Sequence, residues 1–396
     1  MSQNIIISGV GCALIDNIYN NISFESPEFQ KYISIKPGDG GLSPGKLVFT
    51  EEFEQFAGTS FQHVLSEITK NKTADVQNIG GPCLVALINA AQMSFDKNIE
   101  VRFFGARGDD LNGSKLEAML EGMPLDLSAY RVMKQTTPFT DVFSDPDFNK
   151  GEGERIFVNN IGTAWNIKPD DLNADFFKAD IQVYGGTALV PNIHDHLDIL
   201  LAKSKKAGAL TIVNTVYDFR NEKKNPNARW PLGSSDKAYS FIDCLITDHE
   251  EALRLSGKPN QNEAMQFFLS LGVNSCIITN GANSVSVAAK STPFQLLEPT
   301  TIPVSELVKK ELAKGVSSGD TTGCGDNFVG GVIASLAGQK TENKKPDILE
   351  ATSWGIASGG FACFYMGGTY NESSLGEKKR KIAPIIRAYQ KQISSL

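Results

Sequence analysis

Histidine is scarce in this sequence, and its few cysteines are scattered. The 396 residues include four histidines and six cysteines, and no two cysteines stand at the C-x-x-C spacing. This pattern argues against a zinc ribbon or a disulfide framework, and it predicts a cytoplasmic protein. His194 and His196 lie two residues apart and cannot share one face of a helix, so we interpret both as surface or structural histidines.

A basic surplus and long apolar runs are also missing. The net charge is −7, whereas nucleic-acid-binding proteins usually carry a net basic charge or a basic stripe. The main basic cluster, residues 378–381, is interpreted as the solvated face of a helix. Every apolar run stops short of the ~18 residues that a membrane-spanning helix needs. We therefore expect neither a nucleic-acid partner nor a membrane partner.

The apolar content and the alternation of strand-like with helix-like segments predict an α/β fold. Apolar residues make up 41% of the chain, enough to bury a full core. From about residue 180, apolar strand-like runs alternate with helix-like segments, which is typical of a parallel sheet built from βαβ units. Ligands of such sheets bind beyond the carboxyl ends of the strands. The polar residues that close three of these runs, Asn214, Asp248 and Thr279, are therefore candidate site residues.

One glycine-rich turn carries the clearest chemistry. It reads Asp320-Thr321-Thr322-Gly323-Cys324-Gly325-Asp326. An apolar, small-residue stretch follows it and predicts a helix, so the Gly323–Gly325 turn would present backbone N–H groups as an anion site. The carboxylate of Asp326 could take a proton from an attacking alcohol while those N–H groups stabilise a phosphoryl group. The simpler alternative is that Asp326 only caps the helix.

This turn resembles the DTxGAGD signature of the PfkB (ribokinase-like) carbohydrate kinases, a family that includes adenosine-kinase-like members. Further motifs of that family occur in the expected order over roughly residues 5–370. They are Gly11-(x4)-Asp16, Gly80-Gly81, residues 105–113, Asp248-x-x-Glu251 and Thr279-Asn280-Gly281. The resemblance implies a doubly wound, mostly parallel sheet flanked by helices, with a small β-rich lid. We expect one domain over residues 1–396, with lid segments near 17–50 and 130–162.

The resemblance also implies roles for individual residues. Asp326 would be the catalytic base, and Gly323, Cys324 and Gly325 would form the anion hole. Asp16, Gly80 and Gly81 would meet the phosphate acceptor. The ATP site would include Asn214, Thr279, Gly281, Asp320 and Thr322. Glu251 and Asp248 would hold Mg²⁺ that arrives with ATP, and K⁺ is a further cation that the resemblance allows.

Five positions depart from the family pattern or have a second interpretation. Val85 stands where the family usually has Asn, and Asn89, one helical turn later, is either its replacement in the acceptor site or a core amide. Cys324 replaces the alanine of the signature. Asp248 and Glu251 also form the Asp-x-x-Glu pattern of a helix capping box, which would explain them without a metal.

The leading hypothesis is an ATP-dependent kinase that phosphorylates a hydroxymethyl group of a sugar or sugar derivative. A nucleoside kinase of the same fold is the first alternative, because segment 17–75 before the double glycine is long. A non-catalytic ligand-binding relative is the second. The expected partners are a small-molecule sugar or nucleoside and ATP, with a homodimer through the lid as the oligomer that the resemblance allows.

Overall fold

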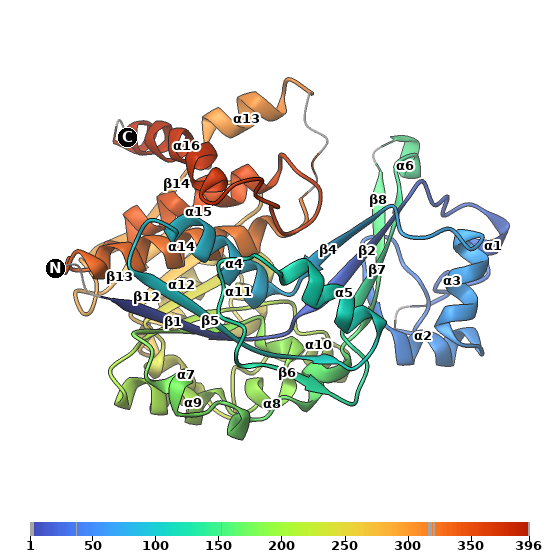
Figure 1. Cartoon of the computed structure of the whole chain (residues 1–396), viewed down its shortest axis with the longest axis horizontal. Helices are drawn as coiled ribbons and strands as arrows, with labels where there is room; N and C mark the ends of the chain where they lie inside the picture. The colour runs from blue at the N-terminus through green and yellow to red at the C-terminus, as the bar shows by residue number, and fades with distance from the viewer. Residues whose placement is uncertain (1–3, 37, 152, 316–318, 320, 395–396) are drawn as a thin grey trace.

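A mostly parallel sheet runs through the larger part of the molecule (Figure 1). The computed structural model describes residues 4–36, 38–151, 153–315, 319 and 321–394. The main sheet has nine strands in the order β14-β13-β12-β11-β10-β9-β1-β5-β6. All neighbours from β12 to β6 are parallel, whereas β12–β13 and β13–β14 are antiparallel. The predicted α/β fold is therefore confirmed.

Most strands of the main sheet are short and apolar, except the ten-residue β5 and the largely exposed β14. The strands of this sheet are β1 (Ile5–Val10), β5 (Ile99–Gly108), β6 (Tyr130–Met133), β9 (Ile181–Gly185), β10 (Leu210–Asn214), β11 (Cys244–Asp248), β12 (Ser275–Thr279), β13 (Val285–Ala289) and β14 (Leu297–Ile302). The interior strand β9 is buried along its whole length. Such burial is expected of a parallel strand that helices cover on both faces.

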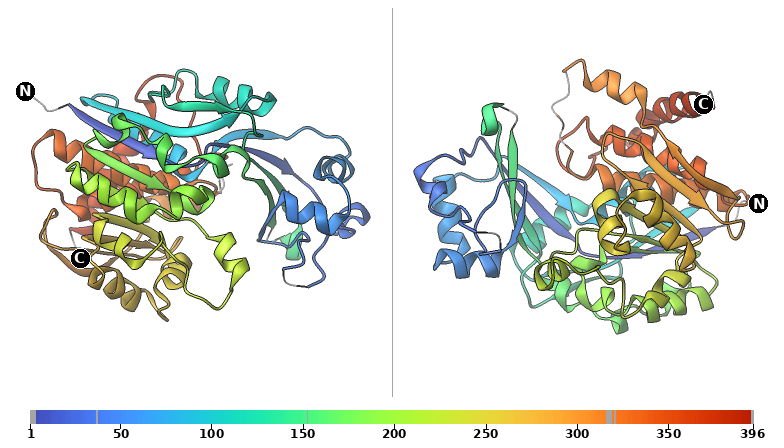
Figure 2. Two further views of the ribbon diagram at one scale, coloured as in Figure 1. Left: turned by 90° about the horizontal axis from the view of Figure 1, so that it is seen from below. Right: turned by 180° about the vertical axis from the view of Figure 1, so that it is seen from behind.

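Helices cover both faces of this sheet (Figures 1 and 2). One face packs against α4 (Pro82–Ser94), α5 (Leu111–Leu120), α13 (Glu306–Leu312), α14 (Cys324–Thr341), α15 (Ile348–Ala362) and α16 (Glu377–Ile393). The other packs against α7 (Ala174–Phe177), α8 (Pro191–His194), α9 (Leu197–Lys206), α11 (His249–Ser256) and α12 (Gln261–Ser270). Helix α10 is Phe219–Lys224, and 3₁₀ turns occupy Gly162–Asn166, Pro169–Asp171, Thr187–Leu189 and Asp236–Phe241. None of the helices in the described ranges is both long enough and apolar enough to cross a bilayer.

A second sheet forms the lid, which projects from one end of the main body (Figure 2). Its order is β3-β8-β7-β2-β4. The strands are β2 (Leu14–Asn20), β3 (Leu47–Phe49), β4 (Val76–Gly80), β7 (Phe139–Asp145) and β8 (Glu154–Asn160). The lid helices are α1 (Pro27–Gln30), α2 (Thr50–Ala57) and α3 (Phe61–Thr69), and α6 (Phe148–Gly151) lies in the β7–β8 turn. A separate apolar core joins α1–α3 to this sheet.

The first lid segment extends beyond its predicted end at residue 50, and the second begins later than its predicted start at residue 130. The segment after residue 50 belongs to the lid as well, because α2 and α3 turn apolar residues such as Phe53 and Val64 toward the lid core. Strand β4 then adds an edge strand to the lid sheet. Strand β6, at the start of the expected segment 130–162, instead pairs with β5 of the main sheet.

Candidate functional site

Neighbouring strands of the main sheet end side by side, and candidate residues lie at those ends. Asn214 at the end of β10 pairs with Gly185 at the end of β9. Asp248 at the end of β11 pairs with Thr279 at the end of β12. The carbonyl oxygen of the Asn214 side chain is buried and has no hydrogen-bond partner within the described part of the chain. An unpaired buried acceptor at a strand end is a place where a ligand donor would be stabilised.

Two other residues predicted to bind ATP, Gly281 and Thr322, differ in their exposure to solvent. Gly281 is exposed in the turn two residues beyond Thr279, at φ +54°. Thr322 is half-buried beside the turn Gly323-Cys324-Gly325, which we call the anion turn. Asp320 lies outside the described residues, so its expected role stays a prediction.

Asp326 occupies the first turn of α14, directly after the anion turn. The helix begins at Cys324, and its N-cap is Gly323 with φ +70°. A Cβ on Gly323 would lie 2.4 Å from the Cα of Gly368, so a larger residue does not fit there. No group in the described ranges forms a hydrogen bond with the Asp326 carboxylate, which therefore does not act as a helix cap. Burial raises the pKa of Asp326 to about 6, close to the range in which a carboxylate works as a general base.

Asp16 on strand β2 lies against the double glycine. A Cβ on Gly80 would lie 2.4 Å from the Oδ2 atom of Asp16, and a Cβ on Gly81 would lie 2.3 Å from the carbonyl oxygen of Cys12. Burial, followed by the charges of Asp326 and Asp16, raises the pKa of the Cys12 thiol to about 12. The charges of Asp326 and Asp16 both act on the Cys12 thiol. The predicted base and the predicted acceptor-binding carboxylate therefore lie in the same region.

Asp248 and Glu251 form the capping box that the sequence allowed. The backbone N–H of Glu251 donates to Oδ1 of Asp248 at 2.8 Å, and the N–H of Asp248 donates to Oε2 of Glu251 at 3.5 Å. The hydroxyl of Thr215, which directly follows Asn214, also donates to Glu251. The predicted capping box is thus present in the structure. The binding of a metal by these two residues stays a prediction.

The same two carboxylates also fit Mg²⁺. Burial raises the pKa of Glu251, and the charges of Asp248 and Asp326 raise it further. A divalent cation would relieve this repulsion. Among the described residues no three His, Cys, Asp or Glu side chains converge as a complete metal site. Mg²⁺ usually takes one or two protein carboxylates together with waters and substrate phosphates, so a pair of carboxylates is a suitable donor set.

Asn327, next to the candidate base, ties the anion turn to its surroundings. Its side-chain amide donates to the carbonyl oxygens of Gly323 at 2.8 Å and Gly368 at 2.7 Å. Its own backbone carbonyl accepts from Asn89 at 2.8 Å. Asn89 is only 1% exposed, and it holds α4 against α14. Its amide nitrogen therefore serves as a core amide, while its side-chain oxygen has no hydrogen-bond partner in the described part of the chain. The acceptor-binding role of Asn89 stays a prediction.

Lys378 corrects the interpretation of the basic cluster. Its ammonium group donates to Oδ1 of Asn327 at 2.7 Å, and the side chain is 1% exposed. Lys378 lies four residues before the buried Ile382, so it falls on the buried face of α16 instead of the solvated face. Burial lowers the pKa of Lys378 to about 7. Lys378 thus contacts the residue that directly follows the candidate base in the chain.

Arg155 on lid strand β8 is a site residue that the sequence analysis missed. Its Nη1 and Nη2 atoms donate to the hydroxyls of Thr322 at 2.8 Å and Thr321 at 3.0 Å. Its neighbours Ile156 and Val158 lie in the lid core. Alternation along the strand therefore turns Arg155 and Phe157 toward the anion turn. The only sequence signal was an arginine in a strand with alternating apolar residues.

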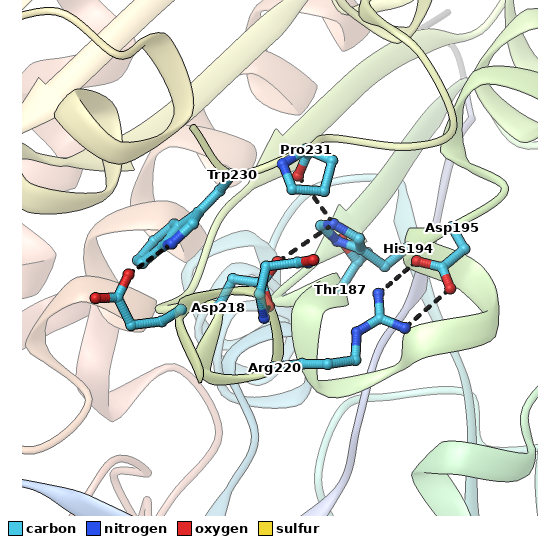
Figure 3. A network of polar contacts seen from close by, with 9 residues as sticks. Thr187, His194, Asp195, Asp218, Arg220, Trp230 and Pro231 are labelled. Atoms are coloured by element: carbon cyan, nitrogen blue, oxygen red, sulfur yellow. Dashed lines mark hydrogen bonds and ion pairs between the residues drawn. The ribbon is translucent and has the colours of Figure 1, made fainter. Parts of the chain in front are cut away.

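A buried polar network around His194 contacts Asp218 and Pro231, which lie in the segment that follows Asn214 in the chain (Figure 3). His194 contacts the Thr187 hydroxyl through Nδ1 and the Pro231 carbonyl through Nε2, both at 3.1 Å, and Asp218 lies 3.7 Å from Nε2. Burial lowers the pKa of His194. The neutral ring therefore donates from Nε2 to Pro231, and the expected structural role of His194 agrees with this network.

Comparisons with known proteins agree with the fold and the motifs. The pfkB family carbohydrate kinase profile matches residues 56–374. A fructokinase from Vibrio alginolyticus is 28% identical over 126 residues, which are 32% of this chain and 36% of that protein. Probable fructokinase-4 from Arabidopsis thaliana is 27% identical over 259 residues, 59% of this chain and 67% of that protein. The matched region thus spans about a third of the first of these relatives and about two thirds of the second.

Solved structures show the same architecture. An adenosine kinase from Schistosoma mansoni, in complex with 2-fluoroadenosine, superimposes with a TM-score of 0.67 at 16% identity, covering 92% of this chain and 97% of that protein. At this identity the similarity shows the fold alone. The ribokinase-like sheet, the small second sheet and the ordered motifs all agree with the profile match. The chain therefore belongs to the pfkB family of carbohydrate kinases.

Proposed function

We propose that this protein transfers the γ-phosphoryl group of ATP to a hydroxymethyl group of a sugar or sugar derivative. The observation that carries the proposal is Asp326, a carboxylate at the N-terminus of α14 with no hydrogen-bond partner in the described ranges and a pKa raised to about 6. A helix cap or a structural ion pair would have a partner. A carboxylate that is desolvated and unpaired, beside an anion-binding turn, is suited to take a proton from an alcohol.

The proposed reaction divides between three parts of the site. Asp16 accepts hydrogen bonds from acceptor hydroxyls and places one of them near Asp326. Asp326 takes the proton of that hydroxyl as its oxygen attacks the γ-phosphorus, and the bond between this phosphorus and the β–γ bridging oxygen breaks so that ADP leaves. The backbone N–H groups of the turn Gly323-Cys324-Gly325 donate to the oxygens of the phosphoryl group and stabilise the charge that develops on them.

Residues from both parts of the molecule would hold the nucleotide. Asn214, Thr279, Gly281 and Thr322 border its proposed site. Arg155 is placed to donate to a phosphate oxygen in place of the Thr322 hydroxyl. Mg²⁺, held by Glu251 and Asp248 together with the phosphates, would neutralise charge on ATP. The dependence on K⁺ and the homodimer through the lid stay predictions.

A nucleoside acceptor is the second candidate, and Phe157 favours it. The ring of Phe157 lies on the same face of β8 as Arg155, whose guanidinium carbon is 5.8 Å from the ring centroid. An aromatic ring on the lid face that is turned toward the site can stack on a nucleobase. Substitution of Phe157 by Ala would then raise the KM of a nucleoside more than that of a free sugar.

A substrate screen tests the proposal. ADP formation from MgATP would be measured with pentoses, hexoses, sugar phosphates, sugar acids and nucleosides, and Asp326→Asn would be assayed in parallel. We expect one acceptor class to give ADP with the wild type at least ~100-fold faster than with the variant, as for the loss of a general base. Equal rates in both proteins would contradict the proposal. Acceptor binding without ADP formation would favour a non-catalytic relative.

A further inference from the structure

Two cysteine sulfurs meet beside the anion turn. The Sγ atoms of Cys324 and Cys363 are 3.2 Å apart. Cys324 is the first residue of α14, and Cys363 directly follows the last residue of α15. The two residues are 39 positions apart in the chain, so only the packing of α14 on α15 brings them together.

The other four cysteines differ from this pair in exposure. Cys12, Cys83, Cys244 and Cys276 are at most 1% exposed, and burial raises the pKa of each thiol. Such thiols are poor nucleophiles. Cys324 and Cys363 are half-buried and can be reached from solvent. In addition, the N-terminus of a long helix favours a thiolate over a thiol, and the thiolate is the form that oxidants attack.

We infer that Cys324 and Cys363 form a redox pair whose oxidation to a disulfide stops phosphoryl transfer. Hydrogen peroxide is the oxidant. The thiolate of one cysteine attacks a peroxide oxygen, the O–O bond breaks, and a sulfenic acid and hydroxide form. The second thiol then attacks the sulfenic sulfur, the S–O bond breaks, and water leaves as the S–S bond forms. Two electrons pass from the two sulfurs to the peroxide, and a dithiol reductant returns them.

The location of the pair explains why its oxidation would affect the reaction. A disulfide has an S–S distance of about 2.05 Å, so the two sulfurs must move about 1 Å closer than they now are. Cys324 is the middle residue of the anion turn, and its carbonyl oxygen lies 2.8 Å from where a Cβ on Gly359 would be. On the other side, a Cβ on Gly319 would lie 2.1 Å from the carbonyl oxygen of Cys363. Because Gly359 and Gly319 pack closely against these two carbonyl groups, we expect the approach of the sulfurs to shift the backbone of the anion turn.

The expected kinetic effect follows from this shift and rests on the proposed function. Moving one N–H donor of an anion hole out of place lowers kcat, in line with the ~100-fold losses seen when such donors are removed. The acceptor site around Asp16 and Gly80 does not include either sulfur. We therefore expect peroxide to lower kcat by at least about tenfold with little change in the KM of the acceptor.

Peptide mapping after peroxide treatment tests the chemistry without relying on activity. The full-length protein would be treated with hydrogen peroxide, its remaining thiols blocked, and the protein digested without reduction. We expect a peptide that joins Cys324 to Cys363 and disappears after dithiothreitol. A disulfide between other cysteines, or sulfinic acid at Cys324 without a linked peptide, would overturn the inference.

Kinase assays on the same samples test the consequence. We expect the lost kcat of the wild type to return with dithiothreitol. Cys363→Ser should keep the basal activity and resist peroxide, and Cys363→Ala is the second variant in case the serine protein folds poorly. A linked peptide with unchanged kcat would overturn the inhibitory role. If the reduced protein phosphorylates no acceptor, the proposed function fails and the inhibition falls with it, whereas peptide mapping still decides whether the pair oxidises.

Discussion

Arg155 donates from Nη1 to the hydroxyl of Thr322 at 2.8 Å, although 167 positions separate the two residues in the chain. The contact joins lid strand β8 to the loop that leads into the anion turn. When an acceptor lies under the lid, Arg155 would bring a positive charge to the place where phosphoryl charge develops. The lid would then contribute to the chemistry as well as to covering the acceptor.

Replacing Arg155 by Met should lower kcat by at least about tenfold, because a charge-assisted contact to a phosphoryl group is lost. Arg131→Met is a matched control, since Arg131 on β6 pairs with Asp171 at the surface. Steady-state kinetics of both variants would decide the matter. If Arg155→Met turned over as fast as the control, Arg155 would have only a structural role in holding the lid.

Asp16→Ala should raise the KM of the acceptor by about tenfold or more and leave the KM of ATP nearly unchanged, because hydrogen bonds to a charged carboxylate are lost. The control is Asp75→Ala, which removes a lid carboxylate that pairs with Lys72 near the surface. Separate titrations of ATP and acceptor give the two constants. Equal increases in both would remove Asp16 from the acceptor site.

Glu251→Gln separates metal binding from helix capping. If Glu251 supports Mg²⁺, the Mg²⁺ concentration for half-maximal rate should rise by about tenfold, as for loss of a group that supports a metal. If Glu251 only caps α11, the free energy of unfolding should fall by about 1 kcal/mol while the Mg²⁺ dependence stays constant. Glu263→Gln is the control, because Glu263 accepts from the Asn260 side chain at the start of α12, where Asn260 is the N-cap.

Lys378 should make stability depend on pH. Its pKa is about 7 in the folded protein and 10.5 in the unfolded chain, so between these values the unfolded chain binds more protons. The contribution of Lys378 to the free energy of unfolding therefore rises with pH, by at most about 1.4 kcal/mol per pH unit. Lys378→Met should flatten the increase in stability between about pH 7 and 8.5, measured by urea unfolding. An unchanged difference between wild type and variant across this range would show that the ammonium is not buried.

The fold and much of the site could be predicted because their signals are local. Strand-like runs ended in polar residues at 214, 248 and 279, and the sheet places these residues at one edge. The glycine-rich turn leads directly into α14, so its geometry depends on neighbouring residues. The lid boundaries were less predictable, because the segment that forms α2 and α3 is mixed in composition and only the lid core shows which side is apolar.

The residues that were missed or misassigned depend on contacts far apart in the chain. Arg155 reads as an exposed strand residue until β8 is placed next to Thr322. Lys378 reads as one of several surface lysines, and only the packing of α16 shows that it reaches Asn327. Asn89 donates to the backbone carbonyl of Asn327, a contact that only the packing of α4 on α14 shows. In each case the decisive partner lies more than 50 positions away in sequence.

Asp326 is the proposed base, and the pH dependence of the reaction rate gives a first test of this role. Burial raises the pKa of Asp326 to about 6, so the carboxylate is ionised above this value and protonated below it. The kcat/KM of the free enzyme should therefore rise with pH through about 6 and then level off. A limb near the ordinary pKa of aspartate, about 4, would show that the carboxylate is not desolvated in solution.

The most direct test is the turnover number of Asp326→Asn with the acceptor found in the screen. The amide has nearly the shape of the carboxylate and removes a half-buried, unpaired charge, so the melting temperature should stay the same or rise. We predict a fall in kcat of at least ~100-fold with ATP binding retained. A folded variant that binds ATP and turns over within a few-fold of the wild type would contradict the account.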